Sequence, residues 1–280
     1  RALMPWSNLR SLTIAAQRLS HSPSVRGATT WYGKTGTAYL TDMEPLTENQ
    51  KRRYSRNIML DGIGPDGQKR LLESHMAVVG CGALGSIVSM YLAGSGVGRL
   101  TVVDFDTIDI SNLQRQLSFA TSECGQKKSS ATVRRLREIN PDIDITGIDG
   151  LLTRGNIGES IAGADIIIEG SDNPATKYMV TDYAVSAGIP YVMGGVENWR
   201  GQVMSWSPGH KSYRDIFPES AAEGGFTPCA LGGVHGPLPG IIGAAMASEA
   251  IKIICRCGTP LYDRMLVVDT EDMTTMVINL

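Results

Sequence analysis

The chain has 280 residues, of which 42% are apolar, and it carries 26 basic and 28 acidic residues. This length suits one large α/β domain, or one domain with small additions. The balanced charge creates no broad field for nucleic acid or anionic lipid, and no run of eighteen apolar residues predicts a membrane span. We therefore expect small molecules or specific protein surfaces as partners, without membrane or nucleic acid.

Cysteine usage indicates the compartment. The five cysteines are odd in number and scattered, at Cys81, Cys124, Cys229, Cys255 and Cys257. Such a set argues against a disulfide framework and for a reducing environment, so we expect a cytoplasmic location.

Residues 1–45 differ in composition from the rest of the chain. Residues 1–41 contain no Asp or Glu, but they carry five Arg or Lys residues and many Ser and Thr. We expect a disordered or artificially added extension, with a transit peptide as the alternative. The segment Gly27–Thr35 resembles a P-loop, but five residues separate its glycines where the motif has four, and no apolar strand precedes it. The folded unit is therefore predicted to be a single domain over 46–280.

The first predicted elements of this domain are two helices. Thr47 and Gln50 form a capping box, which opens a helix running through Lys51 to Arg56. Gly64-Pro65 then interrupts the chain before a short helix over Asp66–Glu73.

The stretch 76–106 organises the rest of the chain. An apolar strand, Met76–Val79, leads into Gly80-Cys81-Gly82-Ala83-Leu84-Gly85, a G-x-G-x-x-G pattern that is followed by a helix. A second strand, Leu100–Val103, ends in Asp104, nineteen positions after Gly85 and near the usual offset of a carboxylate that bonds a ribose hydroxyl. The pattern predicts a nucleotide site in which Gly80, Gly82 and Gly85 approach phosphate and Asp104 binds ribose. Alone, this loop also suits an NAD(P) dehydrogenase.

A polar cluster after Asp104 favours a triphosphate over a dinucleotide. It comprises Asp106, Asn112, Gln114 and Arg115, beyond a carboxyl strand end, where open sheets bind ligands. A basic helix from Lys128 to Glu138 brings another cation to the same cleft, although a surface lysine is the alternative.

The second half of the chain continues the alternation of strands and helices. A buried strand, Ala164–Glu169, ends near Asp172, which suits either a Mg²⁺ ligand or an N-cap for the helix that runs from Lys177 to Ala187. Further strands are predicted over 143–148, 191–193, 202–205 and 265–269, with a helix over 240–255 and a polar end after the last strand. The elements predict a Rossmann-like, doubly wound α/β fold with a mostly parallel sheet, helices on both faces and a mixed or antiparallel C-terminal extension. The irregular stretch 208–228 is a candidate lid opening on Cys229.

An ordered set of motifs extends from residue 53 to residue 252. They are Arg53-Tyr54-Ser55-Arg56, the glycine loop, Asp104-Phe105-Asp106, Ser111-Asn112-Leu113-Gln114-Arg115-Gln116, Gly125 to Lys128, Ser171-Asp172-Asn173, Gly201-Gln202-Val203 and Glu249-Ala250-Ile251-Lys252. With this set the chain resembles the ThiF/MoeB/HesA family, bacterial relatives of ubiquitin-activating enzymes, over about residues 46–270. The resemblance implies an ATP-dependent adenylyltransferase that uses Mg²⁺. Its substrate would be the C-terminal glycine carboxylate of a small ubiquitin-like sulfur carrier ending in Gly-Gly, in thiamine or molybdopterin biosynthesis, and its products an acyl-adenylate and pyrophosphate.

The resemblance also implies roles for single residues. The implied nucleotide site consists of Asp104 on ribose, Arg115 and Lys128 on the phosphates, Asn112 and Gln114 near them, and Asp172 on Mg²⁺. Arg56 resembles the family arginine that reaches across a twofold interface into the partner's site, which implies a homodimer. No general base is required, because the substrate carboxylate is already ionised at pH 7, so His235 is expected to be a packing or loop residue.

Cysteine chemistry and zinc are the points at which the resemblance is incomplete. Cys229 stands in the family's crossover loop, where a cysteine can form a thioester or join a persulfide relay; the alternative is an inert buried thiol. The stretch Ser212–Asp215 stands where family members have a first Cys-x-x-Cys zinc pair, and no second pair follows. Cys255 and Cys257 do not replace it, since a Cys-x-Cys spacing inside a helix turns the thiols about 200° apart. We expect no zinc site, and a loop over 208–228 that is held by packing alone.

Two other functions remain open. One is a family offshoot that activates another carboxylate, on a tRNA nucleoside or a short peptide, and the lack of a basic surplus argues against tRNA. The other is a non-catalytic nucleotide-binding scaffold, against which the intact set of predicted ATP residues argues.

Overall fold

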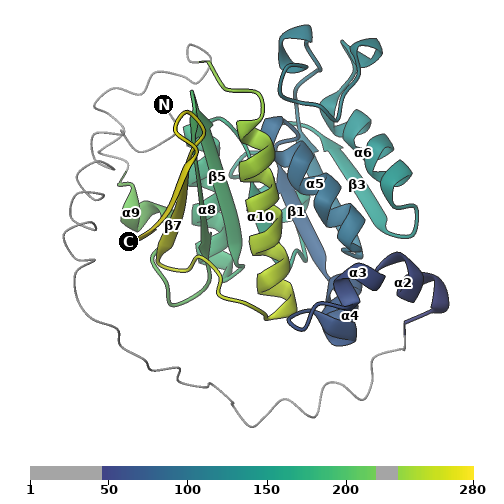
Figure 1. Ribbon diagram of the computed structural model, residues 1–280. Coiled ribbons are helices and arrows are strands. Elements are labelled where there is room, and N and C mark those ends of the chain that lie inside the picture. The colour runs from purple at the N-terminus through teal and green to yellow at the C-terminus, as the bar shows by residue number, and fades with distance from the viewer. Residues whose placement is uncertain (1–45, 219–232) are drawn as a thin grey trace, which may run out of the picture.

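The structure is a computed structural model that describes residues 46–218 and 233–280. The extension 1–45, which contains Gly27–Thr35, lies outside the described residues, and so does Cys229. Figure 1 shows a central sheet with helices on both of its faces. The limits of the domain at 46–280 stay a prediction.

Helices and strands alternate through the first half of the chain. The helices are α2 (Glu48–Arg53), α3 (Ser55–Ile58), α4 (Gly64–Glu73), α5 (Ala83–Ser95), α6 (Lys128–Ile139), α7 (Ile157–Ser160), α8 (Pro174–Ala187), α9 (Tyr213–Ile216) and α10 (Leu238–Cys255), with 3₁₀ turns η1 (Ile110–Asn112) and η2 (Thr121–Glu123). The strands are β1 (His75–Val79), β2 (Arg99–Asp104), β3 (Asp144–Asp149), β4 (Ile166–Glu169), β5 (Tyr191–Glu197), β6 (Arg200–Trp206), β7 (Arg264–Asp269) and β8 (Thr274–Asn279).

Eight strands form one sheet in the order β3-β2-β1-β4-β5-β6-β7-β8. The strands from β1 to β5 are parallel, whereas β6, β7 and β8 pair antiparallel. This confirms the predicted doubly wound, mostly parallel sheet with an antiparallel C-terminal extension. The prediction that the last strand ends at Asp269 is wrong, because Thr274–Asn279 forms a further edge strand. Its Met276 and Ile278 pack on the core while Val277 is exposed, and polar residues are common on such edges.

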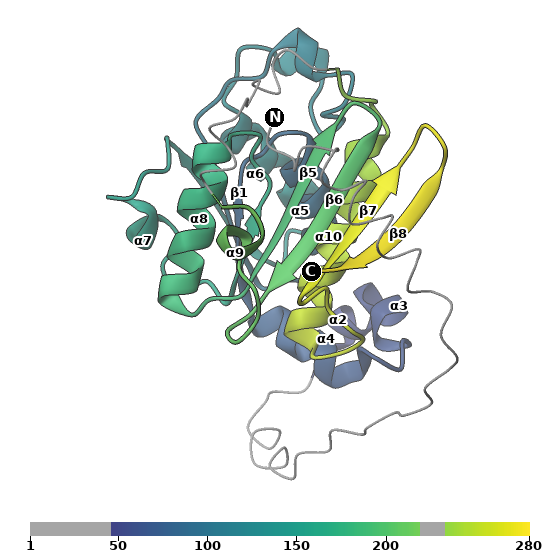
Figure 2. The same cartoon turned by 90° about the vertical axis from the view of Figure 1, so that its left-hand side faces the viewer.

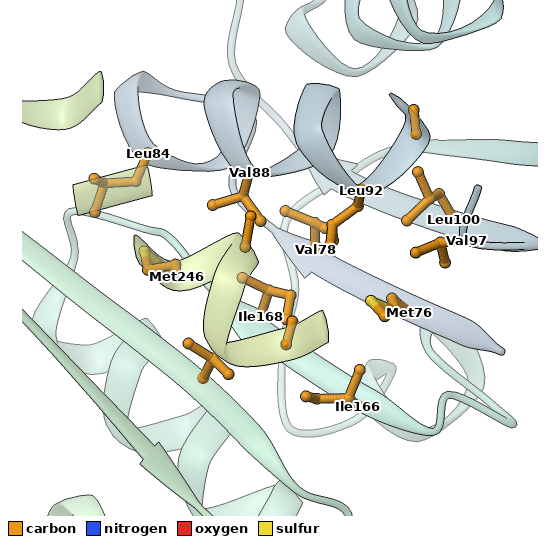
Figure 3. Packing of buried hydrophobic residues seen from close by; sticks show 14 of the residues in the cluster. Met76, Val78, Leu84, Val88, Leu92, Val97, Leu100, Ile166, Ile168 and Met246 are labelled. Carbon is orange, nitrogen blue, oxygen red and sulfur yellow. The ribbon is translucent and has the colours of Figure 1, made fainter. Parts of the chain in front are cut away.

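Helices cover both faces of the sheet. On one face α5 packs between α6 and α10, and on the other α8 packs with α7 and α9, as Figure 2 shows from the side. In β1, Met76 and Val78 pack in the hydrophobic cluster on the α5 side of the sheet, and Ala77 and Val79 pack in the cluster on the α8 side. Figure 3 shows α5 lying over Met76 and Val78, with Ile168 beside them. Because β1 is buried on both faces, its sequence is a continuous apolar run and not an alternating one.

Helix α10 covers the junction between the parallel and antiparallel strands. Among the described helices it is the one long and apolar enough to cross a membrane, with a mean hydropathy of 1.5 over Leu238–Cys255. Half of that window is buried, and the helix packs against α5, β5 and β6. Its Glu249 accepts hydrogen bonds from the Ser205 hydroxyl (2.8 Å) and the Leu261 N–H (2.7 Å), and it pairs with Lys252. These contacts are those of a core helix.

The helix predicted through Lys51 to Arg56 is interrupted at Tyr54. The capping box of Thr47 and Gln50 is present, but α2 ends at Arg53 and α3 begins at Ser55. Tyr54 is buried, and its hydroxyl accepts a hydrogen bond from Asn140 Nδ2 (2.8 Å). Burial of this ring outweighs the local preference for a continuous helix.

The geometric argument about Cys255 and Cys257 is also wrong, because α10 ends at Cys255. Arg256 adopts a left-handed conformation with φ of 56° and ends the helix, so Cys257 lies outside it. Residues 46–218 and 233–280 contain no cluster of metal-ligating side chains. The absence of a zinc site stays a prediction.

Candidate functional site

The glycine loop joins β1 to α5 at the carboxyl edge of the sheet. Gly80 has φ of 89°, and a Cβ on Gly85 would overlap the Gly80 carbonyl oxygen, so both positions require glycine. The Gly80 N–H donates to the Val103 carbonyl (2.8 Å) and the Gly170 N–H donates to the Val79 carbonyl (2.9 Å), which brings the ends of β2, β1 and β4 together. No side chain caps α5, so the N–H groups of its first turn remain available to an anion. This edge is the switch point of the sheet, where open α/β folds bind ligands.

Asp104, the predicted ribose ligand, ends β2 beside the glycine loop. One carboxylate oxygen accepts a hydrogen bond from the Cys81 N–H (2.6 Å), and the other accepts from the Asp106 N–H (2.8 Å). Burial raises the pKa of the Asp104 carboxyl above its ordinary value. The hydrogen bonds from the Cys81 and Asp106 N–H groups and the charge of Lys128 act in the opposite direction. A carboxylate offers about four lone-pair sites, so capacity remains for ribose hydroxyls.

Lys128 begins α6 next to Asp104 and Asp106. Its side chain is 8% exposed, and Nζ lies 3.0 Å from Asp106 Oδ2. The Lys128 N–H also donates to the Asp106 carbonyl (3.0 Å), which fixes the start of α6 against the end of β2. A triphosphate would compete with Asp106 for this ammonium group. Asp106 therefore also holds Lys128 in place, and its predicted part in cofactor binding stays a prediction.

The segment 110–116 folds back over the glycine loop through η1. Asn112 Oδ1 accepts a hydrogen bond from the Asp109 N–H (3.3 Å), and Arg115 Nη1 donates to the Ser111 carbonyl (3.1 Å). Arg115 makes no ion pair with any described residue, so its other guanidinium donors remain for phosphate. Gln114 is exposed, and its Nε2 lies 3.5 Å from the Val234 carbonyl, at the limit of a hydrogen bond.

Gln116 is a site residue to which the sequence assigned no role. It is 4% exposed, and its Nε2 would lie 3.6 Å from a Cβ placed on Gly82. Its Oε1 has no partner among the described residues, and buried polar atoms are seldom left unpaired. Its place in the polar motif was the available signal.

Asp172 follows β4 at the same edge of the sheet. The N-cap of α8 is Asn173, whose Oδ1 accepts from the N–H groups of Ala175 (2.9 Å) and Thr176 (3.3 Å). The Asp172 carboxylate is exposed, and it has no hydrogen-bond or ion-pair partner within the described part of the chain. A Cβ on Gly80 would lie 3.2 Å from the Ser171 amide nitrogen, so this turn adjoins the glycine loop. An unpaired carboxylate here fits a Mg²⁺ ion that accompanies a triphosphate.

A buried ion pair below Asp172 was not predicted. Glu169, the last residue of β4, is paired with Lys177 of α8, and the two side chains are 0% and 1% exposed. Lys177 Nζ also donates to the Gly194 carbonyl (2.9 Å). The signal in the sequence was a glutamate that ends the apolar run Ile166–Glu169.

Arg56 lies away from the other site residues. The Asn57 side chain next to it donates to the Ser95 carbonyl at the C-terminal end of α5 (3.4 Å), whereas the glycine loop is at the N-terminal end. Figure 1 shows α2, α3 and α4 together below the sheet. The thirteen residues of α5 separate the two ends by about 20 Å, which is much longer than an arginine side chain. Arg56 is exposed and forms no ion pair with a described residue.

The first part of the predicted lid, residues 208–218, contains α9. Ser212 and Asp215 form a capping box, and the Arg214 guanidinium donates to both carboxylate oxygens of Asp182 (2.9 and 2.7 Å). The Tyr213 N–H donates to the Tyr191 hydroxyl (2.6 Å). The expectation of a segment held by packing alone is wrong for these residues, because hydrogen bonds and an ion pair also fix them.

His235 has contacts that agree with a packing residue. Its ring lies 4.2 Å from the Trp199 ring between centroids, and Nδ1 lies 3.2 Å from the Thr270 hydroxyl. Its N–H donates to the Asn198 carbonyl (2.8 Å), which ties residues 233–236 to the β5–β6 turn.

Residues 54–280 match the ThiF family. The chain belongs to this family. It is 40% identical over 229 residues to the SAMP-activating enzyme E1 of Haloferax volcanii, covering 82% of this chain and 85% of that protein. It is 37% identical over 217 residues to the sulfur carrier protein ThiS adenylyltransferase of Escherichia coli, covering 77% and 86%. With the probable adenylyltransferase/sulfurtransferase MoeZ of Mycobacterium tuberculosis the identity is 37% over 240 residues, and this ThiF-family chain spans only 61% of that longer protein.

Solved structures confirm the fold assignment. The structure of E. coli MccB with ATP superposes with a TM-score of 0.70 at 26% identity, covering 81% of this chain and 71% of that chain. The predicted family and the predicted Rossmann-like architecture are therefore both confirmed.

Proposed function

We propose that this ThiF-family adenylyltransferase activates the C-terminal glycine carboxylate of a small ubiquitin-like sulfur carrier with MgATP. A carboxylate oxygen of the carrier forms a bond to the α-phosphorus of ATP. The bond from that phosphorus to the bridging oxygen of the β-phosphate breaks, and pyrophosphate leaves. The two relatives named for SAMP activation and for ThiS adenylylation support this class of substrate.

Alignment and charge neutralisation would supply most of the catalysis. A carboxylate is a weak nucleophile, and it must approach an anionic phosphate. Asp104 would orient the ribose, while Arg115 and Lys128 would hold the phosphates. Mg²⁺ held by Asp172 would neutralise charge that develops on the leaving pyrophosphate. No residue needs to remove a proton.

The unpaired Asp172 carboxylate beside the glycine loop carries this proposal. The glycine loop and Asp104 would serve a dinucleotide equally well, but a dinucleotide gives no reason for a free carboxylate at the end of β4. A metal-bound triphosphate gives one, together with Arg115 and Lys128 nearby.

We also propose that the protein acts as a homodimer in which Arg56 of each subunit serves the other subunit's site. Its distance from the glycine loop along α5 supports an action between subunits and not within one.

We further propose that the protein acts in the cytoplasm. The four described cysteines are unpaired, which agrees with a reducing compartment.

ATP–pyrophosphate exchange tests the proposal. We expect exchange with carriers that end in Gly-Gly and none with the same carriers lacking the last glycine. The Cys229→Ala variant should retain this exchange, because a thiol has no part in adenylation. No exchange with any carrier, although the protein binds ATP, would refute the assignment. Exchange supported only by a short peptide would move the assignment to peptide activation.

A further inference from the structure

We infer that the buried Glu169–Lys177 pair positions Asp172 for metal binding, so that Glu169 and Lys177 are positioning residues of the adenylation site. The inference rests on the proposed function in one respect only, which is that Asp172 binds the metal of MgATP.

The ion pair joins three elements directly beneath the turn that carries Asp172. Glu169 ends β4, and its Oε1 accepts hydrogen bonds from the Ser171 N–H (3.0 Å) and from the Ser171 hydroxyl. Its Oε2 pairs with Lys177 of α8, which also donates to the Gly194 carbonyl of β5 (2.9 Å). The ion pair thus ties the turn to β4 and α8 through Glu169, and to β5 through Lys177.

Asp172 lies between two anchored neighbours. On one side Ser171 is held by Glu169 through both its amide and its hydroxyl. On the other side Asn173 is held by its two capping bonds to the first turn of α8. Asp172 itself has no partner among the described residues, so its position is set by these neighbours and not by its own contacts.

Stability alone does not account for this pair. Removing two charges from water is costly, and apolar side chains of similar size often replace a buried ion pair without loss of stability. The hydrogen bonds to Ser171, by contrast, need an acceptor oxygen at this position, which an apolar side chain lacks. Residues that orient a metal ligand typically change metal affinity by about 10- to 100-fold when they are altered.

Two variants separate positioning from folding. Ser171→Ala removes the hydroxyl bond and leaves the ion pair intact, so it is expected to fold. The double variant Glu169→Met with Lys177→Met removes the network without leaving one buried charge unpaired. The matched control is Ser205→Ala, which loses a similar buried hydroxyl bond to a glutamate, Glu249. Ser205 bonds to α10 on one face of the sheet, whereas Glu169 and Lys177 pair on the face that α8 covers.

The probe is Mn²⁺, titrated into the full chain with α,β-methylene ATP and followed by the electron paramagnetic resonance signal of free Mn²⁺. We expect the Mn²⁺ dissociation constant to rise about 10-fold in Ser171→Ala and further in the double variant. Affinity for the nucleotide without metal should stay within about twofold of wild type, because the glycine loop and Asp104 are unchanged. Ser205→Ala should lower the Tm and leave Mn²⁺ affinity unchanged.

Wild-type Mn²⁺ affinity in a folded double variant would overturn the inference. So would an equal loss of Mn²⁺ affinity in Ser171→Ala and Ser205→Ala, since the effect would then be general destabilisation. If Asp172→Asn leaves Mn²⁺ affinity unchanged, the premise about the metal ligand is wrong and the inference falls with it. The titration needs no carrier, so it stands or fails separately from the carrier-dependent exchange that tests the proposed function.

Discussion

The parallel and antiparallel parts of the sheet hold their structures in different ways. In the parallel part, Gly80 and Gly170 follow the ends of β1 and β4, and Asp104 ends β2. The register of these three strands brings the residues together. In the antiparallel part, α9 is held by side chains distant in sequence, as in the pair of Arg214 with Asp182. In the parallel part, the topology of the sheet positions the predicted site residues. In the antiparallel part, individual polar contacts between side chains fix the position of α9.

This difference predicts two kinds of variant. Changes at the carboxyl edge of the parallel strands should alter catalysis or nucleotide binding with little effect on the rest of the fold. Changes around α9 should alter stability and leave nucleotide chemistry intact.

The largest effect is expected from Asp172→Ala. Loss of the predicted metal ligand should lower carrier-dependent ATP–pyrophosphate exchange by at least about 100-fold, because charge on the leaving group is no longer neutralised. The thermal unfolding midpoint should change little, since Asp172 is exposed and has no partner among the described residues. The matched control is Asp142→Ala, an exposed carboxylate that pairs with Arg53 away from the glycine loop. Exchange at the wild-type rate in Asp172→Ala would show that the metal assignment is wrong.

Arg56 tests whether the carboxyl edge is complete within one subunit. Arg56→Ala alone should be nearly inactive, as should Asp172→Ala alone. Mixing the two variants should restore about a quarter of wild-type exchange, because half of the dimers are mixed and each mixed dimer has one complete site. Demonstrated subunit exchange without any recovery would count against an action of Arg56 between subunits.

The glycine loop allows a comparison of the same substitution, glycine to alanine, at Gly82 and at Gly85. A Cβ on Gly85 would overlap the Gly80 carbonyl, so Gly85→Ala should reduce stability by about 1–3 kcal/mol and disrupt nucleotide binding. A Cβ on Gly82 would meet nothing closer than 3.6 Å, so Gly82→Ala should fold normally. Thermal unfolding and binding of a fluorescent ATP analogue measure the two effects. Equal unfolding midpoints in the two variants would contradict the geometry of the loop.

The smallest effect is expected at α9, where Ser212→Ala should lower the unfolding free energy by about 1 kcal/mol through loss of the N-cap. Hydrogen bonds from the Ser212 hydroxyl and N–H hold the pKa of the Asp215 carboxyl below its ordinary value. A carboxyl pKa that is lower in the folded state adds stability above the unfolded pKa of about 4, and this stability is lost as pH falls through the folded value.

The difference in Tm between wild type and Ser212→Ala should therefore narrow below about pH 4. Thermal unfolding from pH 3 to pH 7 measures this difference, and ATP–pyrophosphate exchange should be unchanged at pH 7. A difference that widens in acid would contradict the capping account.

The same contrast explains which features the sequence could predict. The strands and loops of the parallel part are local patterns, so the apolar run of β1, the glycine spacing and Asp104 were sufficient to predict them. Tyr54 interrupts a helix because its ring packs against distant residues, and no local pattern records that burial. Edge strand β8 mixes three polar with three apolar residues and shows no clear alternation, and α9 depends on Asp182 and Tyr191 on other elements. Glu169 and Lys177 were missed for the same reason, since their importance comes from a pairing that only the fold creates.

Intact-mass spectrometry of the carrier tests the central claim most directly. A carrier ending in Gly-Gly, incubated with the protein and MgATP, should gain the mass of one AMP, and the same carrier without its last glycine should gain none. The adduct should also be absent when the protein carries Asp172→Ala. A protein that binds ATP but adenylates no carrier, or that adenylates the truncated carrier equally well, would contradict the account.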